Sequence, residues 1–248
     1  MAKVLGKRQL RTIDELVEYY VSNPEPFRRA LLSIQAYIDS SDKLKSLIHS
    51  VKSRIKEPDH LKDKLIRKAI EAREKKKPFV INKNNLFRKI NDLAGYRIIH
   101  LHTKQFQEID FELKKIFAEQ QWLIVEGPSA KTWDDESREY FKQIGVKVSK
   151  SPNMYTSVHY VIKPNSTAQI TCEIQVRTLM EEVWGEVDHS INYPNKSNIH
   201  SIREQIKVLA RVTSSCSRLV DSIFSTYYDQ KSSINAKRIT VTNKKKPR

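Results

Sequence analysis

The chain has 248 residues, of which 39% are hydrophobic and 30% charged, so it is long enough to bury a core in one large domain or two small ones. Five glycines and nine prolines exclude a collagen-like or low-complexity protein. The longest apolar runs, such as Leu123 to Val125, are far too short to cross a bilayer. The 45 Lys and Arg against 29 Asp and Glu give a net charge of +16, which favours polyanionic partners such as nucleotides, nucleic acid or an anionic membrane surface.

Cysteine usage and the chain ends indicate the compartment. Cys172 and Cys216 are not spaced for a zinc site or a redox pair, so neither a disulfide scaffold nor a structural metal is expected. The N-terminus lacks the apolar stretch of a signal peptide, and no apolar face or lipidation signal accompanies the basic C-terminus. We therefore expect a soluble, cytoplasmic protein without membrane association.

Residues 1–46 are predicted to form helices that pack on the domain after them. Thr12 to Glu15 has the form of a capping box and predicts a helix that ends before Pro24. Pro26 is placed to open a second helix.

Strands and helices alternate after this. Strands are predicted at 47–56, 94–101, 122–126, 146–149, 155–162 and 170–176, and helices at 61–77, 104–120 and 178–191, with 134–136 a loop or a helix start. This order predicts an α/β (α+β) fold with one mixed sheet of about five strands flanked by helices.

A long helix is predicted over 199–228. Its apolar residues recur at steps of three and four, and we interpret them as core: Ile202, Ile206, Leu209, Val212, Cys216, Leu219 and Ile223. The helix belongs to a C-terminal segment, 195–230, and the basic tail 231–248 is expected to be disordered.

Three short segments place polar residues where a strand ends or a helix begins, as sheet enzymes do with their sites. In the first, Arg54 and Lys56, with Lys62 and Lys64 beyond them, form a row of cations that suits a polyphosphate, although such a row can also be a solvated face. In the second, Asp92 opens an apolar strand and could hold Mg²⁺, although taken alone it is better interpreted as a strand-initiating residue.

The third segment joins two neighbouring strands. Alternation points Tyr155, Ser157 and His159 to one face of the first strand, and Glu173, Gln175 and Arg177 to one face of the second. So many polar groups predict a wet or occupied face of the sheet. Tyr155 could stack on a planar base, and Glu173 could bind metal or accept a hydroxyl proton, whereas His159 alone is better read as a structural histidine.

Taken in order, these motifs resemble the synthetase domain of RelA/SpoT-type alarmone enzymes. The resemblance runs from about residue 47 to 194, and Glu173 to Thr178 is its most specific stretch. It implies a nucleotidyltransferase-like mixed sheet and an ATP-dependent pyrophosphokinase. The implied reaction moves the β,γ-pyrophosphate of ATP to the ribose 3′-hydroxyl of GDP or GTP and makes (p)ppGpp.

The resemblance also implies a role for each matching residue. It assigns Arg54, Lys56, Lys64 and Arg97 to ATP, Asp92 to Mg²⁺, Glu173 to the metal or the acceptor 3′-hydroxyl, and Tyr155, Ser157, His159, Gln175 and Arg177 to the acceptor. Trp184 and His189 match a helix that supports the site, so we assign them packing roles.

Departures from the family pattern leave the acceptor open. Met154 and Thr156 flank Tyr155 where many relatives carry Gly and Arg or Gln, His60 replaces a Ser, and no His-Asp dipeptide of a hydrolase half is present. The resemblance therefore implies synthesis without degradation, by a small alarmone synthetase. Some toxic members of that group pyrophosphorylate the 3′-terminal adenosine of tRNA, which is a second interpretation.

A third interpretation is a non-catalytic RNA-binding module on an inherited fold. It predicts RNA affinity that survives loss of Asp92 and Glu173. An oligomer partner or an antitoxin protein would dock on the helices before residue 40 or after residue 199.

Overall fold

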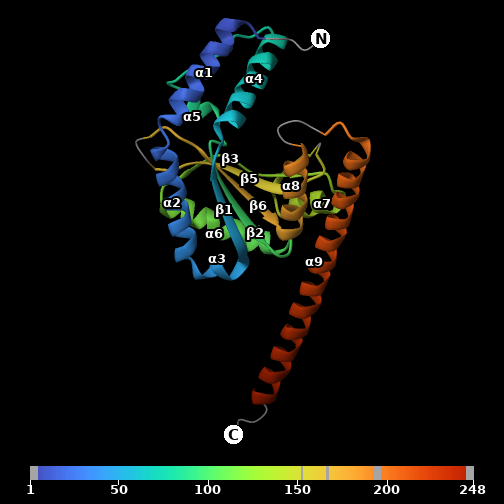
Figure 1. The fold of residues 1–248 in the computed structure, drawn as a ribbon. Helices are drawn as coiled ribbons and strands as arrows, with labels where there is room; N and C mark the ends of the chain where they lie inside the picture. Colours follow the sequence, from blue (N-terminus) through green and yellow to red (C-terminus); the bar gives the residue numbers. More distant parts are fainter. Residues whose placement is uncertain (1–4, 152, 166–167, 193–196, 244–248) are drawn as a thin grey trace.

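The computed structural model describes residues 5–151, 153–165, 168–192 and 197–243, without the side chains of 232–243. A six-stranded sheet lies between two groups of helices (Figure 1). The strands are β1 (Ile48–Ile55), β2 (Ala94–His100), β3 (Leu123–Thr132), β4 (Lys147–Lys150), β5 (Ser157–Lys163) and β6 (Cys172–Thr178).

The sheet is mixed, as predicted, and has the order β1-β2-β6-β5-β3-β4. The pairs β2–β6 and β3–β4 are parallel, and the other three pairs are antiparallel. The parallel β2–β6 pair matters most for the site, because it brings residues near 95 and near 173 side by side in the middle of the sheet.

Nine helices surround the sheet among the described residues. They are α1 (Lys7–Val21), α2 (Glu25–Ser40), α3 (Asp42–Leu47), α4 (Pro58–Glu74), α5 (Leu86–Lys89), α6 (Gln105–Glu119), α7 (Asp135–Gln143), α8 (Leu179–Asn192) and α9 (His200–Asn243). Helix α2 packs on β1, β2 and β6, whereas α8 lies over β2 and β6 from the other side and carries α9 on its outer surface (Figure 1).

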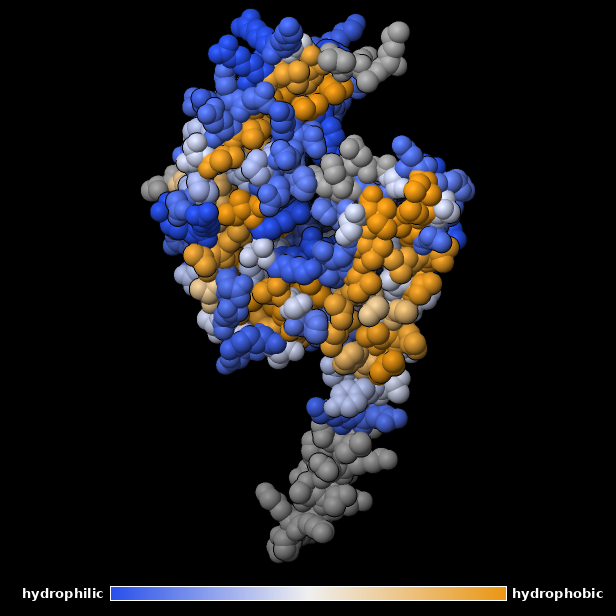
Figure 2. Space-filling model, viewed as in Figure 1, coloured by the Kyte–Doolittle hydropathy of each residue, from blue (hydrophilic) through white to orange (hydrophobic). Residues whose placement is uncertain are grey.

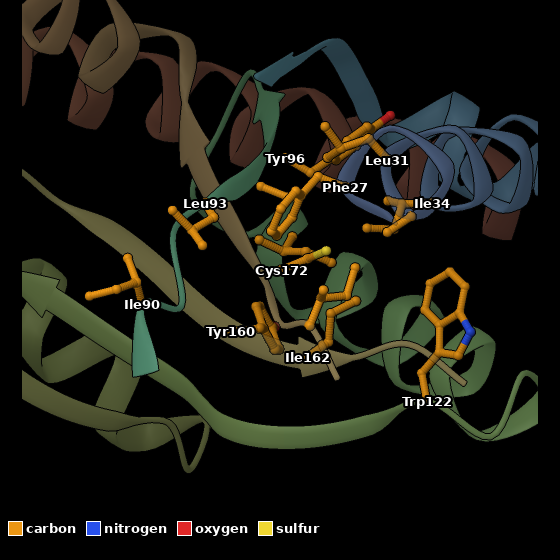
Figure 3. Packing of buried hydrophobic residues seen from close by; sticks show 14 of the residues in the cluster. Phe27, Leu31, Ile34, Ile90, Leu93, Tyr96, Trp122, Tyr160, Ile162 and Cys172 are labelled. Atoms are coloured by element: carbon orange, nitrogen blue, oxygen red, sulfur yellow. The ribbon is translucent and has the colours of Figure 1, made fainter. Parts of the chain in front are cut away.

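Strand alternation divides the central sheet into an apolar face and a polar face. Alternate residues of β2, β5 and β6 are buried in the core with α2: Tyr96, Ile98, Tyr160, Ile162, Cys172 and Ile174. Phe27, Leu31 and Ile34 of α2 meet them in the same core (Figure 3). The residues in between, including Arg97 and Glu173, therefore turn toward α8.

The first helix starts earlier than the capping-box motif predicted. Helix α1 begins at Lys7, where the Gln9 side chain caps the Gly6 backbone N–H, and Thr12 lies inside the helix and donates a hydrogen bond to the Arg8 carbonyl. The four residues from Lys7 to Leu10 are good helix formers, so the helix extends back through them. The prediction that a proline opens the second helix is confirmed, since Pro26 lies in the first turn of α2.

Two predicted elements change in length. Strand β3 continues to Thr132, beyond the predicted end at residue 126, because its second half pairs with both β4 and β5. Strand β5 starts at Ser157, so Tyr155 lies in the preceding loop, where Met154 has a positive φ of 54°. The prediction that Tyr155 is a strand residue is therefore wrong.

Helix α9 differs most from its prediction. Ile206 is buried, but Val212, Leu219 and Ile223 are more than half exposed, so the interpretation of the whole stripe as core is wrong. The reason is that these three side chains lie on the outer face of α9, roughly opposite the residues that it buries against the body, Ile206, Ala210 and Thr213.

The C-terminal segment is also helical further than predicted. Helix α9 runs to Asn243, through residues 231–243 of the tail that was expected to be disordered, because no Pro or Gly interrupts it. Residues 244–248, and the predicted boundary at residue 194, lie outside the described residues. None of the helices described combines the length and the apolar character that crossing a membrane requires.

The core predicts one stability difference. Phe27 is fully buried and contacts the rings of Tyr20 and Phe87. The substitution Phe27→Ala should lower the free energy of unfolding by about 3–5 kcal/mol, measured by urea denaturation. Phe111→Ala on α6, where the side chain is 67% exposed, is the matched control and should change it by less than about 0.5 kcal/mol.

Candidate active site

A cavity of about 880 Å³ opens on the polar face of the sheet, between Arg67 of α4 and helices α8 and α9. Figure 2 shows hydrophilic residues gathered in the hollow between these parts. Seven of the predicted site residues line the cavity: Arg54, Asp92, Arg97, Tyr155, Glu173, Gln175 and Arg177. The structure therefore brings together residues that are up to 123 positions apart in the sequence.

The register of the strands explains this convergence. Lys52, Arg97, Gln175 and His159 are cross-strand neighbours in one row over β1, β2, β6 and β5. In the next row Arg54 pairs with Gly95, which pairs with Glu173. Because the residues of one row point to the same face, cations and a carboxylate meet over the middle of the sheet.

Two lysines hold Asp92 just before β2. Its Oδ2 lies 3.0 Å from Lys56 Nζ and its Oδ1 lies 2.8 Å from Lys64 Nζ, without hydrogen-bond geometry at Oδ1. Burial is the largest effect and raises the pKa of Asp92, but Lys64 and Lys56 together outweigh it, so the pKa lies below its ordinary value. Asp92 is thus a carboxylate, and both lysines contact the cavity through it.

The N-terminal helices fix the backbone of the same lysine. Tyr20 of α1 donates a hydrogen bond of 2.6 Å from its hydroxyl to the Lys56 carbonyl, and this contact is buried. Burial raises the pKa of the Tyr20 hydroxyl well above its ordinary value, so the hydroxyl remains a donor.

Glu173 is the second carboxylate of the cavity. Its Oε1 lies 2.9 Å from Nδ1 of His159, and its Oε2 accepts a hydrogen bond of 3.0 Å from Gln175. Burial raises the pKa of Glu173, but the contacts with His159 and Gln175 outweigh it and hold the pKa below its ordinary value, while Asp92 acts in the opposite direction. His159 thus contacts the Glu173 carboxylate on the side away from the cavity.

The two carboxylates fit a divalent ion of the magnesium type. Among the described residues no three His, Cys, Asp or Glu side chains cluster as a metal site. Magnesium in phosphoryl-transfer sites commonly takes one or two protein carboxylates and fills its other positions with phosphate and water. Asp92 and Glu173 both line the cavity, so each could supply such a carboxylate once its present partners give way.

Helix α8 supplies carboxylates that the sequence reasoning missed. Glu182 is buried and contacts Lys52 at 2.9 Å, Arg97 at 2.9 Å and Arg177 at 2.6 Å, and Glu186 contacts Arg97 at 2.7 Å. Two sequence signals could have indicated these partners. Glu182 and Glu186 are four residues apart on a helix and so share a face, and Lys52 comes two residues before Arg54 on a strand and so points to the same side.

This network gives two predicted binding residues, Arg97 and Arg177, a second contact with α8. Arg97 and Arg177 line the cavity, but each also pairs with a carboxylate of α8. Burial and the neighbouring Arg97 lower the pKa of Arg177 to about 10, so the guanidinium stays charged at neutral pH. Both arginines therefore link the sheet to α8.

Tyr155 lies between the cavity and α8. Its ring is parallel to the indole of Trp184 within 2°, with centroids 6.4 Å apart, and its hydroxyl lies 3.4 Å from Nε2 of His159. Trp184 is buried and donates a hydrogen bond to the Ile206 carbonyl of α9. The indole therefore supports Tyr155 from α8, in line with the packing role predicted for Trp184. His189, on the same helix, lines the cavity, and its ring lies 6.2 Å from that of His60.

Two predicted acceptor residues do not line the large cavity. His159 contacts it only through Glu173 and Tyr155. Ser157 is buried and lines a second cavity of about 190 Å³, where its hydroxyl lies 3.5 Å from the Val176 carbonyl. Ser157 comes two residues before His159 on β5, so it faces the same side of the sheet but borders this second cavity.

Glu181 holds the loop that carries Tyr155. Its Oε2 accepts a hydrogen bond of 2.8 Å from the backbone N–H of Thr156, and the side chain is buried. Burial raises the pKa of Glu181 from 4.5 to about 7, against the opposing effects of this hydrogen bond and of Arg177.

Comparisons with known proteins agree with this fold. The family model described as a region found in RelA / SpoT proteins matches residues 53–198. GTP pyrophosphokinase YwaC of Bacillus subtilis (strain 168) is 24% identical over 171 residues, which are 66% of this chain and 68% of that protein.

Solved structures are similar over most of the chain. A GTP pyrophosphokinase family protein from Streptococcus pneumoniae has a TM-score of 0.61 at 19% identity, covering 88% of this chain and 95% of that one. Small alarmone synthetase 1 from Bacillus subtilis, bound to its product pppGpp, has a TM-score of 0.57 at 20% identity, covering 83% and 95%. The same synthetase bound to AMPCPP has a TM-score of 0.56 at 17% identity, with the same coverage of both chains.

The raised pKa of Glu181 predicts a pH-dependent stability. Between pH 4.5 and about 7 the folded protein binds this proton more tightly than the unfolded chain, so the group destabilises the fold as pH rises through that range. Glu181→Gln keeps an oxygen that can accept from Thr156. It should raise the free energy of unfolding by about 3 kcal/mol at pH 8 and by much less near pH 4.5, measured by urea denaturation.

The exposed Glu139 on α7 provides the control. Glu139→Gln should show no such difference between the two pH values. Equal effects of Glu181→Gln at pH 4.5 and pH 8 would contradict the assignment.

Proposed function

Because the chain belongs to the RelA/SpoT family, whose model matches more than half of it, we propose that it transfers the β,γ-pyrophosphate of ATP to the ribose 3′-hydroxyl of GDP or GTP and releases AMP. The observation that carries the proposal is that Asp92 and Glu173 line one cavity among arginines and lysines. The names of its relatives support it, since one is a GTP pyrophosphokinase and another was solved with pppGpp and with AMPCPP.

The donor side of the cavity is cationic. Arg54 lies across from Gly95, and its side chain passes within 4 Å of the position that a Cβ on Gly95 would occupy. Lys56 and Lys64 contact Asp92. On binding ATP, Arg54 would grip phosphate oxygens with parallel donors, and the two lysines would turn from Asp92 to the charge of the triphosphate.

Asp92 and Glu173 would hold Mg²⁺ in this cavity. When bound, the ion neutralises charge on the transferred pyrophosphoryl group and aligns its oxygens. The release of Lys56 and Lys64 from Asp92 toward the phosphates would leave both Asp92 oxygens free to coordinate. Alignment and neutralisation are the main contributions that a protein makes to this type of transfer.

The acceptor side is built around Tyr155 and Glu173. The Tyr155 ring, held parallel to Trp184, offers a flat surface for a base, and a stacked base contributes roughly 1–3 kcal/mol of binding free energy. Glu173 is ionised, so it can accept the proton of the 3′-hydroxyl or orient that hydroxyl, and His159 at 2.9 Å holds the carboxylate in place. Gln175 and Arg177 would position the acceptor beside it.

Loss of either carboxylate should abolish the reaction. Asp92→Asn and Glu173→Gln should each lower the rate of pyrophosphate transfer by about 100-fold or more, because each removes charge at the reacting centre. The assay is transfer of labelled phosphate from ATP to GDP or GTP. Glu139→Gln, a matched change on exposed α7, should keep full activity, and near-normal turnover by Glu173→Gln would refute the assignment.

A tRNA 3′ end is a second candidate acceptor. Arg203 and Lys207 of α9 line the cavity in addition to the predicted cations, and the whole chain carries +16. Such a rim suits an acceptor with a long phosphate backbone, and an adenine could stack on Tyr155 as a guanine could.

Product analysis separates the two acceptors. The protein is incubated with labelled ATP and, in parallel, GDP, GTP or deacylated tRNA. We expect label in the guanine nucleotides, with weak dependence on salt. Label in tRNA alone, with a rate that falls steeply from about 50 to 200 mM salt, would contradict the guanine-nucleotide acceptor and favour the tRNA acceptor. RNA binding that survives both Asp92→Asn and Glu173→Gln, without any transfer, would favour a binding module.

A further inference from the structure

Helix α9 forms one wall of the large cavity. Arg203, Ile206 and Lys207 of this helix line the cavity, and at about 100° per residue their side chains fall within an arc of about 100° around the helix axis. The family model ends at residue 198, so all three lie beyond the matched region. Their role is therefore inferred from the structure of this chain.

Trp184 fixes the position of this wall next to Tyr155. Its indole donates a hydrogen bond of 3.1 Å to the Ile206 carbonyl, and its ring is parallel to that of Tyr155. Arg203 lies one turn before Ile206, and Lys207 directly follows it. The two cations therefore border the part of the cavity beside the Tyr155 ring.

Arg203 presents an uncompensated charge to the cavity. Lys207 pairs with Glu204 at 2.7 Å, and both side chains of that pair are about half exposed. Within the described part of the chain, the guanidinium of Arg203 takes part in no hydrogen bond or ion pair. Arg97 and Arg177 differ from it, because each pairs with a carboxylate of α8.

The carboxylates of α8 that line the same cavity have other partners. Glu186 lies 2.7 Å from Arg97, and Asp188 accepts a hydrogen bond of 2.8 Å from the side chain of Asn192. Arg203 can therefore take an anionic group of a ligand. A guanidinium suits phosphate best, because it forms charge-assisted hydrogen bonds with two oxygens at once.

The proposed acceptor would carry such a group on this side of the cavity. Its base would stack on Tyr155, and its 3′-hydroxyl would approach Glu173 on the sheet. The 3′-oxygen and the 5′-carbon project from opposite faces of a ribose ring. A 3′-hydroxyl that points to the sheet therefore directs the 5′-phosphate away from the sheet, toward α9.

We propose that Arg203 binds the 5′-phosphate of the acceptor nucleotide and makes the protein prefer acceptors that are phosphorylated at this position. The role of an acceptor rests on the proposed pyrophosphate transfer. The chemistry is shared by a guanine nucleotide and by the terminal adenosine of a tRNA, because both carry phosphate on the 5′-oxygen of the accepting ribose.

Ligands that differ only in the 5′-phosphate test this role. Dissociation constants of GMP and guanosine, and of AMP and adenosine, are measured by calorimetry with AMPCPP filling the donor side. The wild type should bind the phosphorylated member of one pair at least about 10-fold more tightly. Arg203→Gln should remove most of this preference, whereas a merely structural disturbance would weaken both members alike and leave their ratio unchanged.

Two variants serve as controls. Arg203→Lys keeps the positive charge and should keep part of the preference. Arg211→Gln makes the same change eight residues further along α9, at an exposed position outside this cavity, and should keep the wild-type ratio. A wild type that binds neither pair, or that shows no preference, would overturn the inference, and so would an Arg203→Gln variant with the wild-type ratio.

Steady-state kinetics separate this inference from the proposed function. Arg203→Gln should raise the KM for GDP or GTP by about 10-fold or more, with kcat and the KM for ATP within about two-fold of wild type. If tRNA is the acceptor, the KM for deacylated tRNA should rise instead, and the binding preference should appear with AMP.

The two failures look different. A wild type without transfer to any acceptor would contradict the proposed function, while the binding ratios would still decide on Arg203. Transfer by Arg203→Gln with an unchanged KM for the acceptor would overturn the inference alone.

Discussion

The polar face of the sheet depends on the pairing of opposite charges between buried and half-buried side chains. Asp92 lies against Lys56 and Lys64, Glu173 against His159, and Glu182 against Lys52, Arg97 and Arg177. A buried charge without a partner would cost several kcal/mol, so removal of one member affects all its neighbours. The same pairing keeps the cationic and carboxylate side chains of the cavity close together and charged.

Helix α8 connects the two sides of the cavity. Its carboxylates hold Arg97 and Arg177, its indole supports Tyr155, and Glu181 holds the backbone of Thr156. Helix α8, which itself packs on α9, therefore positions Arg97, Arg177 and Tyr155 together. Helix α8 therefore shapes the cavity through the side chains that it holds in place, although it places no reacting group at the centre of the cavity.

The strands and their faces could be predicted from the sequence, because alternation is a local property. The same alternation placed Arg97, Glu173, Gln175 and His159 on one face, and the strand register then brought them into neighbouring rows. The partners Glu182, Glu186 and Lys52 were not predicted, since ion pairs between α8 and β1 depend on how the helix lies over the sheet. A stripe of apolar residues, such as that of α9, also does not specify whether it packs against the same chain, packs against another chain or stays exposed. Tyr155 was assigned to a strand because the alternating pattern continues through it, whereas the left-handed backbone at Met154 ends that pattern.

The hydrogen bond from Tyr20 to the Lys56 carbonyl links the N-terminal helices to the donor side. Any ligand that orders Lys56 also favours the conformation in which α1 is docked, and undocking of α1 loosens the lysine. With Lys56 in the phosphate-binding role proposed above, nucleotide affinity and the local stability of the first helix would be thermodynamically coupled. A segment outside the cavity would then contribute to affinity for phosphate without touching it.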